Sequence, residues 1–471
     1  MYDPSQHISR PASSRIGRWL ILAALIFAGL AAGAQPVDPA VTLPDRHCAF
    51  LTESLEIAIK QSPQMIQKNI ELAKADAQRL EGDSIRWPSL FGNGRYLVSM
   101  LSATNAKSTT SRGLLYNLEM RQSLFRWGDI KNTLEIDQLT VKLSQKNYAE
   151  SYRDLVTLLR TQFMQLILQK RYLSIIRINE ATTLRLHKEN EEKLKSGQIS
   201  HSEFAGSEIT VEEVQIAVQA QEMQYEQLKR SFARLSGRKE VPDDCIPDDL
   251  PTPEFSSDQA IRLVQDFDQK DMARSTPTAE SKLYVIRQSE LKYKLANTRL
   301  LPKVDLSAGI NQENTTNFAN QSVRQNATNQ KSVGIVANWS IFDGFYTRGA
   351  KRIALEEKRE AEQQLALYFK TLDEQRQSQI GSFGLAARSL ALAERRLAMS
   401  RGGLAYAEEE YKLGRQSDEQ LNQIKGNHML VEYAAMQARV DLYYRWSDLV
   451  SLLWLDPALQ KLPATYLSHG K

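Results

Sequence analysis

Proline is unevenly distributed along this chain, and its absence from two long stretches limits the possible folds most strongly. No proline occurs between Pro88 and Pro242, and none occurs between Pro302 and Pro457. Because proline interrupts helices, both stretches are free to form unusually long ones. An acidic, proline-rich segment, 242–278, lies between them. The sequence therefore predicts two helical halves joined by a linker.

The two halves also repeat each other's sequence features. Ser123-Leu124-Phe125 in the first half matches Ser340-Ile341-Phe342 in the second, and Gly197 matches Gly414. In both halves 74 positions separate the serine from the glycine. An internal duplication of this kind is best identified before any fold is assigned, because it defines the structural unit.

Each half is predicted to begin with a helix and two strands. The helices, near 64–86 and 279–300, end at Trp87-Pro88 and Leu301-Pro302. Apolar and polar residues alternate in the strands that follow, which gives each strand one apolar and one polar face. Strands of about ten residues are long enough to cross a bilayer when tilted. The predicted strands are 89–102, 113–126, 303–312 and 332–342. The polar segment 312–332 is predicted to be an exposed loop, because Asn, Gln, Ser and Thr dominate it.

The alternation also predicts which strand residues share a face. The residues expected on the polar face are Asn117, Glu119, Asp305, Asn311 and Asn338, and those expected on the apolar face are Met120, Val304 and Trp339.

A long helical hairpin is predicted to complete each half, at 128–237 and 346–454. In the first hairpin, apolar residues recur every three or four positions between Leu155 and Ile176, so they lie on one face of a helix. A helix from Asp129 to Lys195 would be about 100 Å long at about 1.5 Å per residue. We interpret these apolar stripes as packing surfaces, since none of them requires a cofactor.

The N-terminus has the features of a secretory signal. Arg10, Arg15 and Arg18 precede a short apolar run, and Ala32-Gly33-Ala34 offers a cleavage site. The alternative is an uncleaved anchor helix. The predicted organisation is thus a signal peptide (1–34), a first repeat (35–241), a linker (242–278), a second repeat (279–456) and a C-terminal tail (457–471).

Composition excludes several classes of protein. The formal charge of +4 and the lack of a dense basic block argue against nucleic-acid binding. A mean hydropathy of −0.43 with a single long apolar run excludes a polytopic helical membrane protein. The sequence has no phosphate-binding loop, nucleophile motif or histidine pair at metal-binding spacing. We therefore expect no cofactor, no metal and no enzymatic activity.

The two cysteines, Cys48 and Cys245, leave two possibilities open. An exported chain reaches an oxidising compartment, where a disulfide between them can form. The alternative is a pair of separate thiols.

Four amphipathic strands cannot close a membrane barrel, because the smallest such barrels have eight. An open sheet edge in lipid leaves backbone groups unpaired, which costs several kcal/mol per group. The strands are therefore expected to pair between chains, while the long helices project into water. The alternative is a periplasmic coiled-coil scaffold without a pore, which would have no use for alternating strands.

These features together resemble the TolC-type outer-membrane efflux family. The resemblance covers about 51–456 and includes Leu301-Pro302, Phe342-Asp343-Gly344 and the hairpin turn Tyr411–Ser417. It implies a mostly α-helical homotrimer with a transmembrane β part, in which a twelve-stranded outer-membrane β-barrel continues into a periplasmic α-helical barrel. It also implies a passive exit duct that works with a periplasmic adaptor protein and an inner-membrane pump, for efflux or type I secretion.

The resemblance directs attention to three sets of residues. The second-repeat turn is followed in the family by acidic residues that close the pore; the matching positions here are Gln420 and Gln423, with Asp418 nearby. The two hairpin turns are either plain turns or adaptor-docking tips, with Gly197, Ile199, Ser200, Gly414 and Ser417 as docking residues. The residues expected to mark the barrel are Pro88, Phe125, Pro302, Phe342, Asp343 and Gly344.

Overall fold

The computed structural model describes residues 43–103, 106–253, 256–319 and 322–467. The chain divides into two units, Met1–Leu43 and Pro44–Lys471, and the fold below is that of the second unit. The predicted signal peptide lies outside the described residues.

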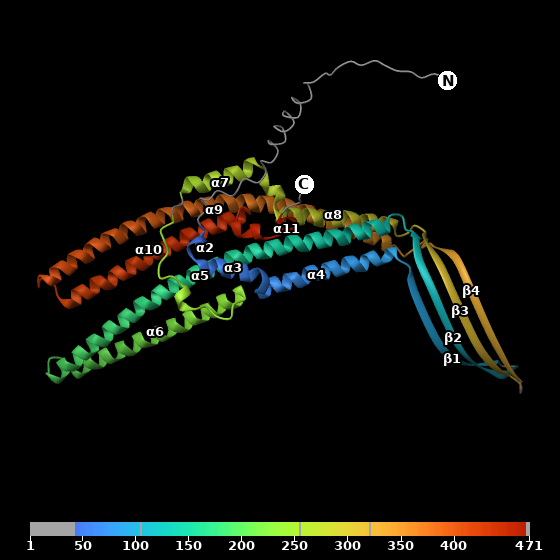
Figure 1. Cartoon of the computed structure of the whole chain (residues 1–471), viewed down its shortest axis with the longest axis horizontal. Coiled ribbons are helices and arrows are strands. Elements are labelled where there is room, and N and C mark those ends of the chain that lie inside the picture. The colour runs from blue at the N-terminus through green and yellow to red at the C-terminus, as the bar shows by residue number, and fades with distance from the viewer. Residues whose placement is uncertain (1–42, 104–105, 254–255, 320–321, 468–471) are drawn as a thin grey trace, which may run out of the picture. The chain divides into compact units, whose positions relative to one another are not determined.

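The first half of this unit consists of short helices, followed by two strands and then by two long helices (Figure 1). Its elements are α2 (Pro44–His47), α3 (Ala49–Gln61), α4 (Pro63–Asp83), η1 (Ser84–Arg86), β1 (Ser89–Ala103), β2 (Ala106–Phe125), α5 (Asp129–Lys195) and α6 (His201–Ser236).

The second half repeats the order of helix, two strands and two long helices. Its elements are η2 (Asp243–Cys245), α7 (Ser257–Gln269), η3 (Met272–Ser275), α8 (Pro277–Thr298), β3 (Lys303–Ala319), β4 (Ser322–Asn338), α9 (Tyr346–Lys412), α10 (Asp418–Leu452), η4 (Pro457–Lys461) and α11 (Ala464–Leu467). The two long helices α5 and α9 both have 67 residues. The segment predicted as a linker contains the helix α7, which begins with a capping box between Ser256 and Gln259.

The four strands form one antiparallel sheet in the order β1-β2-β3-β4. Glu119 pairs with Gly309, and Asp305 pairs with Val336. Since directly paired residues share a face, this register places the predicted polar residues of β2, β3 and β4 on one side of the sheet. Within the described residues, β1 and β4 each have a neighbour on one side only.

The strands are longer than the sequence predicted. Most of the segment 312–332, predicted to be a loop, is instead strand: residues 312–319 belong to β3 and residues 322–332 to β4, and the two strands pair as far as Ala319 and Ser322. The prediction was wrong because polar residues occupy both faces of this part of the hairpin, so no alternation marks it. Backbone hydrogen bonds continue the ladder regardless of the side chains.

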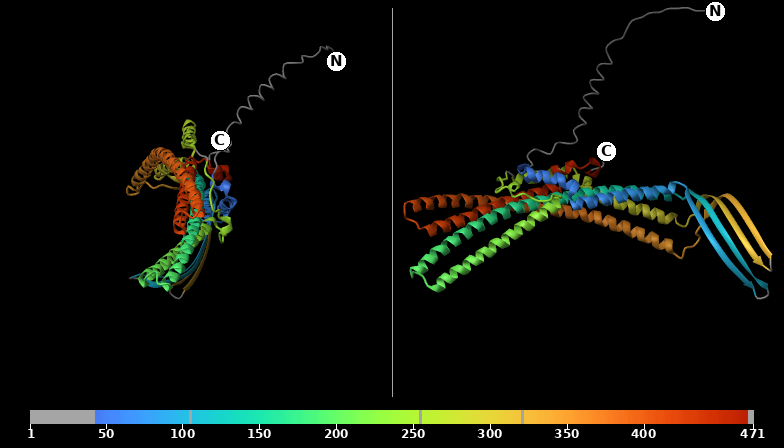
Figure 2. Two further views of the ribbon diagram at one scale, coloured as in Figure 1. Left: turned by 90° about the vertical axis from the view of Figure 1, so that its left-hand side faces the viewer. Right: turned by 60° about the horizontal axis from the view of Figure 1, so that its bottom comes forward.

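The long helices lie side by side in the order α6-α5-α10-α9, with both hairpin turns at the end opposite the sheet (Figures 1 and 2). Inside each hairpin, apolar residues at intervals of seven positions pack against the partner helix. Phe232 of α6 lies 5.6 Å from Phe163 of α5 between ring centroids, and Phe383 of α9 lies 5.6 Å from Trp446 of α10. Spacing of this kind is typical of coiled-coil packing.

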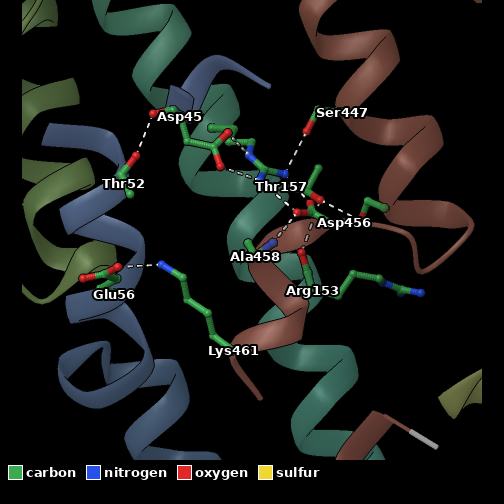
Figure 3. A network of polar contacts seen from close by, with 11 residues as sticks. Asp45, Thr52, Glu56, Arg153, Thr157, Ser447, Asp456, Ala458 and Lys461 are labelled. Carbon is green, nitrogen blue, oxygen red and sulfur yellow. Dashed lines mark hydrogen bonds and ion pairs between the residues drawn. The ribbon is translucent and has the colours of Figure 1, made fainter. Parts of the chain in front are cut away.

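A buried ionic network joins α2 and the segment just before η4 to the middle of α5 (Figure 3). The Arg160 guanidinium is fully buried and donates to both carboxylate oxygens of Asp45, at 3.0 and 2.9 Å. It also donates to both carboxylate oxygens of Asp456, and to Ser447 of α10 at 3.3 Å. Burial alone lowers the pKa of Arg160, but the two carboxylates outweigh it and raise the pKa, so the guanidinium stays charged.

Among the described residues, no helix combines the length and the apolar character needed to cross a membrane.

Candidate functional site

The two hairpin turns have nearly identical geometry. Gly197 has φ +72°, and the Gln198 N–H donates to the Lys193 carbonyl at 2.8 Å. Gly414 likewise has φ +72°, and the N–H that follows it donates to the Glu410 carbonyl at 2.9 Å. A left-handed residue at this position ends a helix and favours glycine, which explains both glycines as turn residues.

A capping box then begins each return helix. The Ser200 hydroxyl accepts the Glu203 N–H, and the Glu203 carboxylate accepts the Ser200 N–H at 2.8 Å. Ser417 and Gln420 form the same pair of bonds, both at 3.2 Å. The docking residues predicted from the sequence lie at these turns, and all of them except the half-buried Ile199 are exposed.

The three residues predicted to form a constriction have different environments. Both glutamines are exposed, but the Gln420 side chain is held in its capping box. Asp418 pairs with Arg185 of α5 at 2.8 Å. Arg185 could not be identified from the sequence, because this contact joins different hairpins and no local pattern marks it.

Polar contacts hold α5 against α10 from the middle of α5 to the hairpin turns. Thr157 bonds to Ser451 at 3.0 Å, and Arg171 pairs with Glu432 at 2.5 Å. The side chains become more exposed toward the turns, where those of Arg185 and Asp418 are 46% and 48% exposed. Exposed ion pairs contribute little stability. The two hairpins are therefore most weakly joined near their turns.

The outer edges of the helical part, α6 and α9, differ from this polar seam. Each carries a stripe of exposed apolar residues at intervals of seven positions, opposite the face that packs inside its hairpin. The stripe on α6 consists of Ile209, Ile216 and Met223, and the stripe on α9 consists of Leu385, Leu392, Met399 and Tyr406. Met399 is 77% exposed and Ile216 is 66% exposed. Apolar patches of this kind mark interaction surfaces.

The predicted barrel residues lie where strands meet helices. Trp127 and Gly128 both have positive φ at the end of β2, and Gly344 and Phe345 both have positive φ after β4. Each turn thus combines one glycine with one aromatic residue, and the aromatic ring contacts a second ring upstream. Phe342 lies 5.4 Å from Phe345, and Phe125 lies 4.9 Å from Trp127, between ring centroids.

The remaining barrel residues support the same junctions. Asp343 accepts the Thr347 N–H at 2.9 Å in the first turn of α9. Pro88 directly precedes β1 and Pro302 directly precedes β3, where the helices have ended. The Trp127 indole donates to the Pro302 carbonyl at 2.7 Å, so one junction is fastened to the other.

Both cysteines are free thiols in the structure. Cys48 is buried beside the start of α3, and burial raises its pKa to about 11. Cys245 lies in η2 and is half-buried. Over the described ranges, no group of three His, Cys, Asp or Glu side chains is arranged to hold a metal ion.

Three comparisons place the chain among known proteins. Its sequence matches the profile of the outer membrane efflux protein family over residues 55–238 and 283–453. No curated protein sequence matches it significantly. The fold is similar to that of the Campylobacter jejuni CmeC outer membrane channel, with 13% identity, a TM-score of 0.68 and coverage of 99% of this chain and 95% of the other.

Two further solved structures have the same fold. The Vibrio cholerae outer membrane protein VceC is 15% identical, with a TM-score of 0.58 and coverage of 88% of this chain and 97% of the other. The open state of the Neisseria gonorrhoeae MtrE outer membrane channel is 13% identical, with a TM-score of 0.62 and coverage of 90% and 93%.

The fold and the hairpin turns thus define a mostly helical protein with a small sheet, of the kind found in outer membrane channels. The chain belongs to the outer membrane efflux protein family. The protein is located in the outer membrane and acts as an efflux channel, as the resemblance predicted. The family is one of transport proteins, in agreement with the expectation that the chain is not an enzyme.

Proposed function

We propose that three copies of this chain form the exit duct of a tripartite efflux or type I secretion system. Four strands from each copy would close a twelve-stranded barrel in the outer membrane. The long helical hairpins would continue the barrel as a tube in the periplasm, after removal of the signal peptide 1–34. The organisation into repeats 35–241 and 279–456, with the tail 457–471, is part of this proposal.

The sheet supports closure between copies rather than within one. Its two edge strands, β1 and β4, lack a second partner among the described residues. One face carries the polar residues that would line a water-filled lumen, and the other carries residues such as Met120 and Val304 that suit lipid. Pairing of β1 with β4 of the next copy would satisfy both edges.

The observation that carries the proposal is the match between the two apolar stripes. Ile209, the first member of the stripe on α6, lies about two helical turns beyond His201, where α6 begins. Tyr406, the last member of the stripe on α9, lies about two helical turns before Lys412, where α9 ends. The start of α6 and the end of α9 both lie at the hairpin turns, and both stripes continue toward the sheet at the same interval. The stripes therefore lie at nearly the same heights, so α6 of one copy can pack against α9 of the next.

This contact joins two different surfaces, so it repeats from copy to copy, and it would close into a ring where the rotation between neighbours brings the third copy back to the first. A ring of three supplies twelve strands and twelve long helices. The exposed turns at Gly197 and Gly414 would then face away from the membrane, where a periplasmic adaptor can reach them. An inner-membrane pump supplies the energy, and the pump and adaptor select the substrate.

Membrane fractionation followed by the mass of the detergent-extracted species tests this proposal. We expect an outer-membrane species of three chains that conducts ions in planar bilayers. A soluble or inner-membrane monomer or dimer would exclude the duct and favour a scaffold without a pore.

The turns of the second hairpin would form the constriction of this duct. Gln423 is exposed in the first turns of α10, and three copies would bring three uncharged side chains together without repulsion. Gln423→Ala should raise the leak conductance of the closed channel. Gln420→Ala should do so too, but it also removes a cap.

Gln420→Glu is the control for the constriction, because glutamate keeps the capping box that Glu203 forms in the first hairpin. Its ring of carboxylates should raise leak through repulsion, with helical content unchanged. Closed-state conductance equal to that of the unaltered chain in all three variants would exclude these glutamines from the constriction.

A further inference from the structure

The segment Pro242–Leu250, here called the acidic strap, connects the two helical hairpins. It leaves the end of α6, crosses α5 and reaches α10 before the chain continues to α7 (Figure 1). Two of its apolar side chains, Ile246 and Leu250, are buried. The strap therefore packs against the helices along its length.

On the first hairpin the strap is bound by two lysines and a tyrosine. Asp243 accepts from Lys229 at 2.9 Å and from the Tyr225 hydroxyl at 3.0 Å. Lys170 of α5 pairs with Asp248 at 2.9 Å and donates to the Ile246 carbonyl at 2.6 Å. The hydrogen bond from Lys229 lowers the pKa of Asp243, so this carboxylate stays charged.

On the second hairpin the strap is bound by one arginine. Arg439 of α10 donates to both Asp249 oxygens at 3.1 Å and to the Leu250 carbonyl at 3.3 Å. Its side chain is 10% exposed, whereas that of Asp249 is 62% exposed, so the strap covers the arginine. The same guanidinium pairs with Glu394 of α9 at 2.7 Å.

The arginine that binds the strap belongs to an ion pair whose two charges are exchanged between the two repeats. Arg177 of α5 and Glu394 of α9 lie at the same distance from the start of their helices, which have equal lengths, and each pairs with its return helix. In the first hairpin the partner of Arg177 is Glu222 of α6, at 2.6 Å. Arg439 lies as far from the start of α10 as Glu222 lies from the start of α6. At this position of the return helix, the second hairpin therefore offers a cation to the acidic strap, whereas the first hairpin offers a carboxylate.

The strap crosses the α5–α10 seam between a strong and a weak region. On one side the buried Arg160 network holds α5 to α10. On the other side the ion pairs that join the two helices, Arg171–Glu432 and Arg185–Asp418, are both partly exposed. If the two hairpins began to separate at their turns, the separation would reach the strap before it reached Arg160.

We propose that the acidic strap is the stop for opening of the duct: it fixes the level at which the two hairpins cease to separate. Binding to both hairpins lets the strap hold them together while the seam beyond it opens and closes. This inference rests on the proposed function for its role in conduction, but the fastening itself belongs to the single chain.

The test is hydrogen exchange and conductance of Asp243→Asn/Asp249→Asn in the full-length detergent-extracted protein. Two partly buried ion pairs lost together should speed amide exchange about five-fold in α5 between Arg160 and Arg171 and in α10 between Glu432 and Ser447. Closed-state leak should rise in the same variant. Helical content should be unchanged, because asparagine keeps the shape of both exposed side chains.

The matched control is Asp244→Asn, which removes one charge from the strap at a position that forms no ion pair among the described contacts. It should leave both exchange and leak unchanged. Exchange that is unaltered in the double variant, or equally raised in the control, would overturn the strap as a stop. Faster exchange in a chain that does not conduct would support the fastening and refute the duct instead.

Discussion

Replacement of Arg160 by methionine should destabilise the helical part by about 3–5 kcal/mol, because it leaves the buried Asp456 and the half-buried Asp45 without their cation. Asp456 is 2% exposed, and both its oxygens accept from this one guanidinium. The Asp456 carboxylate also accepts the Ala458 N–H, but that bond cannot replace a charge. The expected result is a large fall in the urea midpoint of the helical signal.

Arg171→Met is the matched control for that experiment. Arg171 lies on the same helix and also pairs with α10, but its side chain is 29% exposed and that of Glu432 is 36% exposed. A pair of this kind contributes about 0–1 kcal/mol, so the control should unfold near the midpoint of the unaltered chain. Equal midpoints for the two variants would mean that the buried network does not stabilise the fold. Asp45→Asn and Asp456→Asn, introduced together with Arg160→Met, should recover part of the loss.

Ile216→Asp should abolish the proposed trimer, because it introduces a charge where α6 would contact α9 of the next copy. Burial of an isoleucine or methionine side chain contributes about 1.5–3 kcal/mol, and the contact occurs at every interface of the ring. A buried, unpaired carboxylate adds a desolvation penalty to that loss. Light scattering of the detergent-extracted species should therefore show a monomer. Met399→Asp should have the same effect from the other side of the contact.

Gln215→Asp is the control for this prediction. It adds the same charge to an exposed position on the adjacent side of α6, away from the stripe. The trimer should persist in this variant. A trimer that also survives Ile216→Asp and Met399→Asp would show that the copies associate through another surface. The two stripes would then not form the contact between copies.

The long hairpins could be predicted from the sequence because the rules that govern them are local. An absence of proline permits a long helix, and a glycine followed by Ser200 or Ser417 marks a turn and a new start. The residues of the strand-to-helix junctions, such as Phe342 and Gly344, were identified from the resemblance to the efflux family instead. The strand ends were not, since 312–332 is polar on both faces and resembles a loop.

Contacts between distant segments were beyond the reach of such rules. Arg160 binds Asp45 and Asp456, which lie at opposite ends of the chain and outside the ranges that match the family. Arg185 was missed for the same reason, because its partner Asp418 is on the other hairpin. The apolar stripe of α5 was recognised as a packing surface, but the stripes on α6 and α9 were not identified. The sequence did not show that these two helices lie at the outer edges, where their stripes stay exposed within one chain.

If three copies close into the proposed ring, the unlike edges of the helical part have a genetic consequence. A chain with a damaged α9 stripe still offers an intact α6 stripe, so it can join a growing ring but cannot complete it. In a cell that makes damaged and intact chains in equal amounts, about one ring in eight would contain three intact copies. Alleles that alter one edge should therefore be dominant over the normal gene, whereas alleles that prevent folding, such as loss of Arg160, should be recessive.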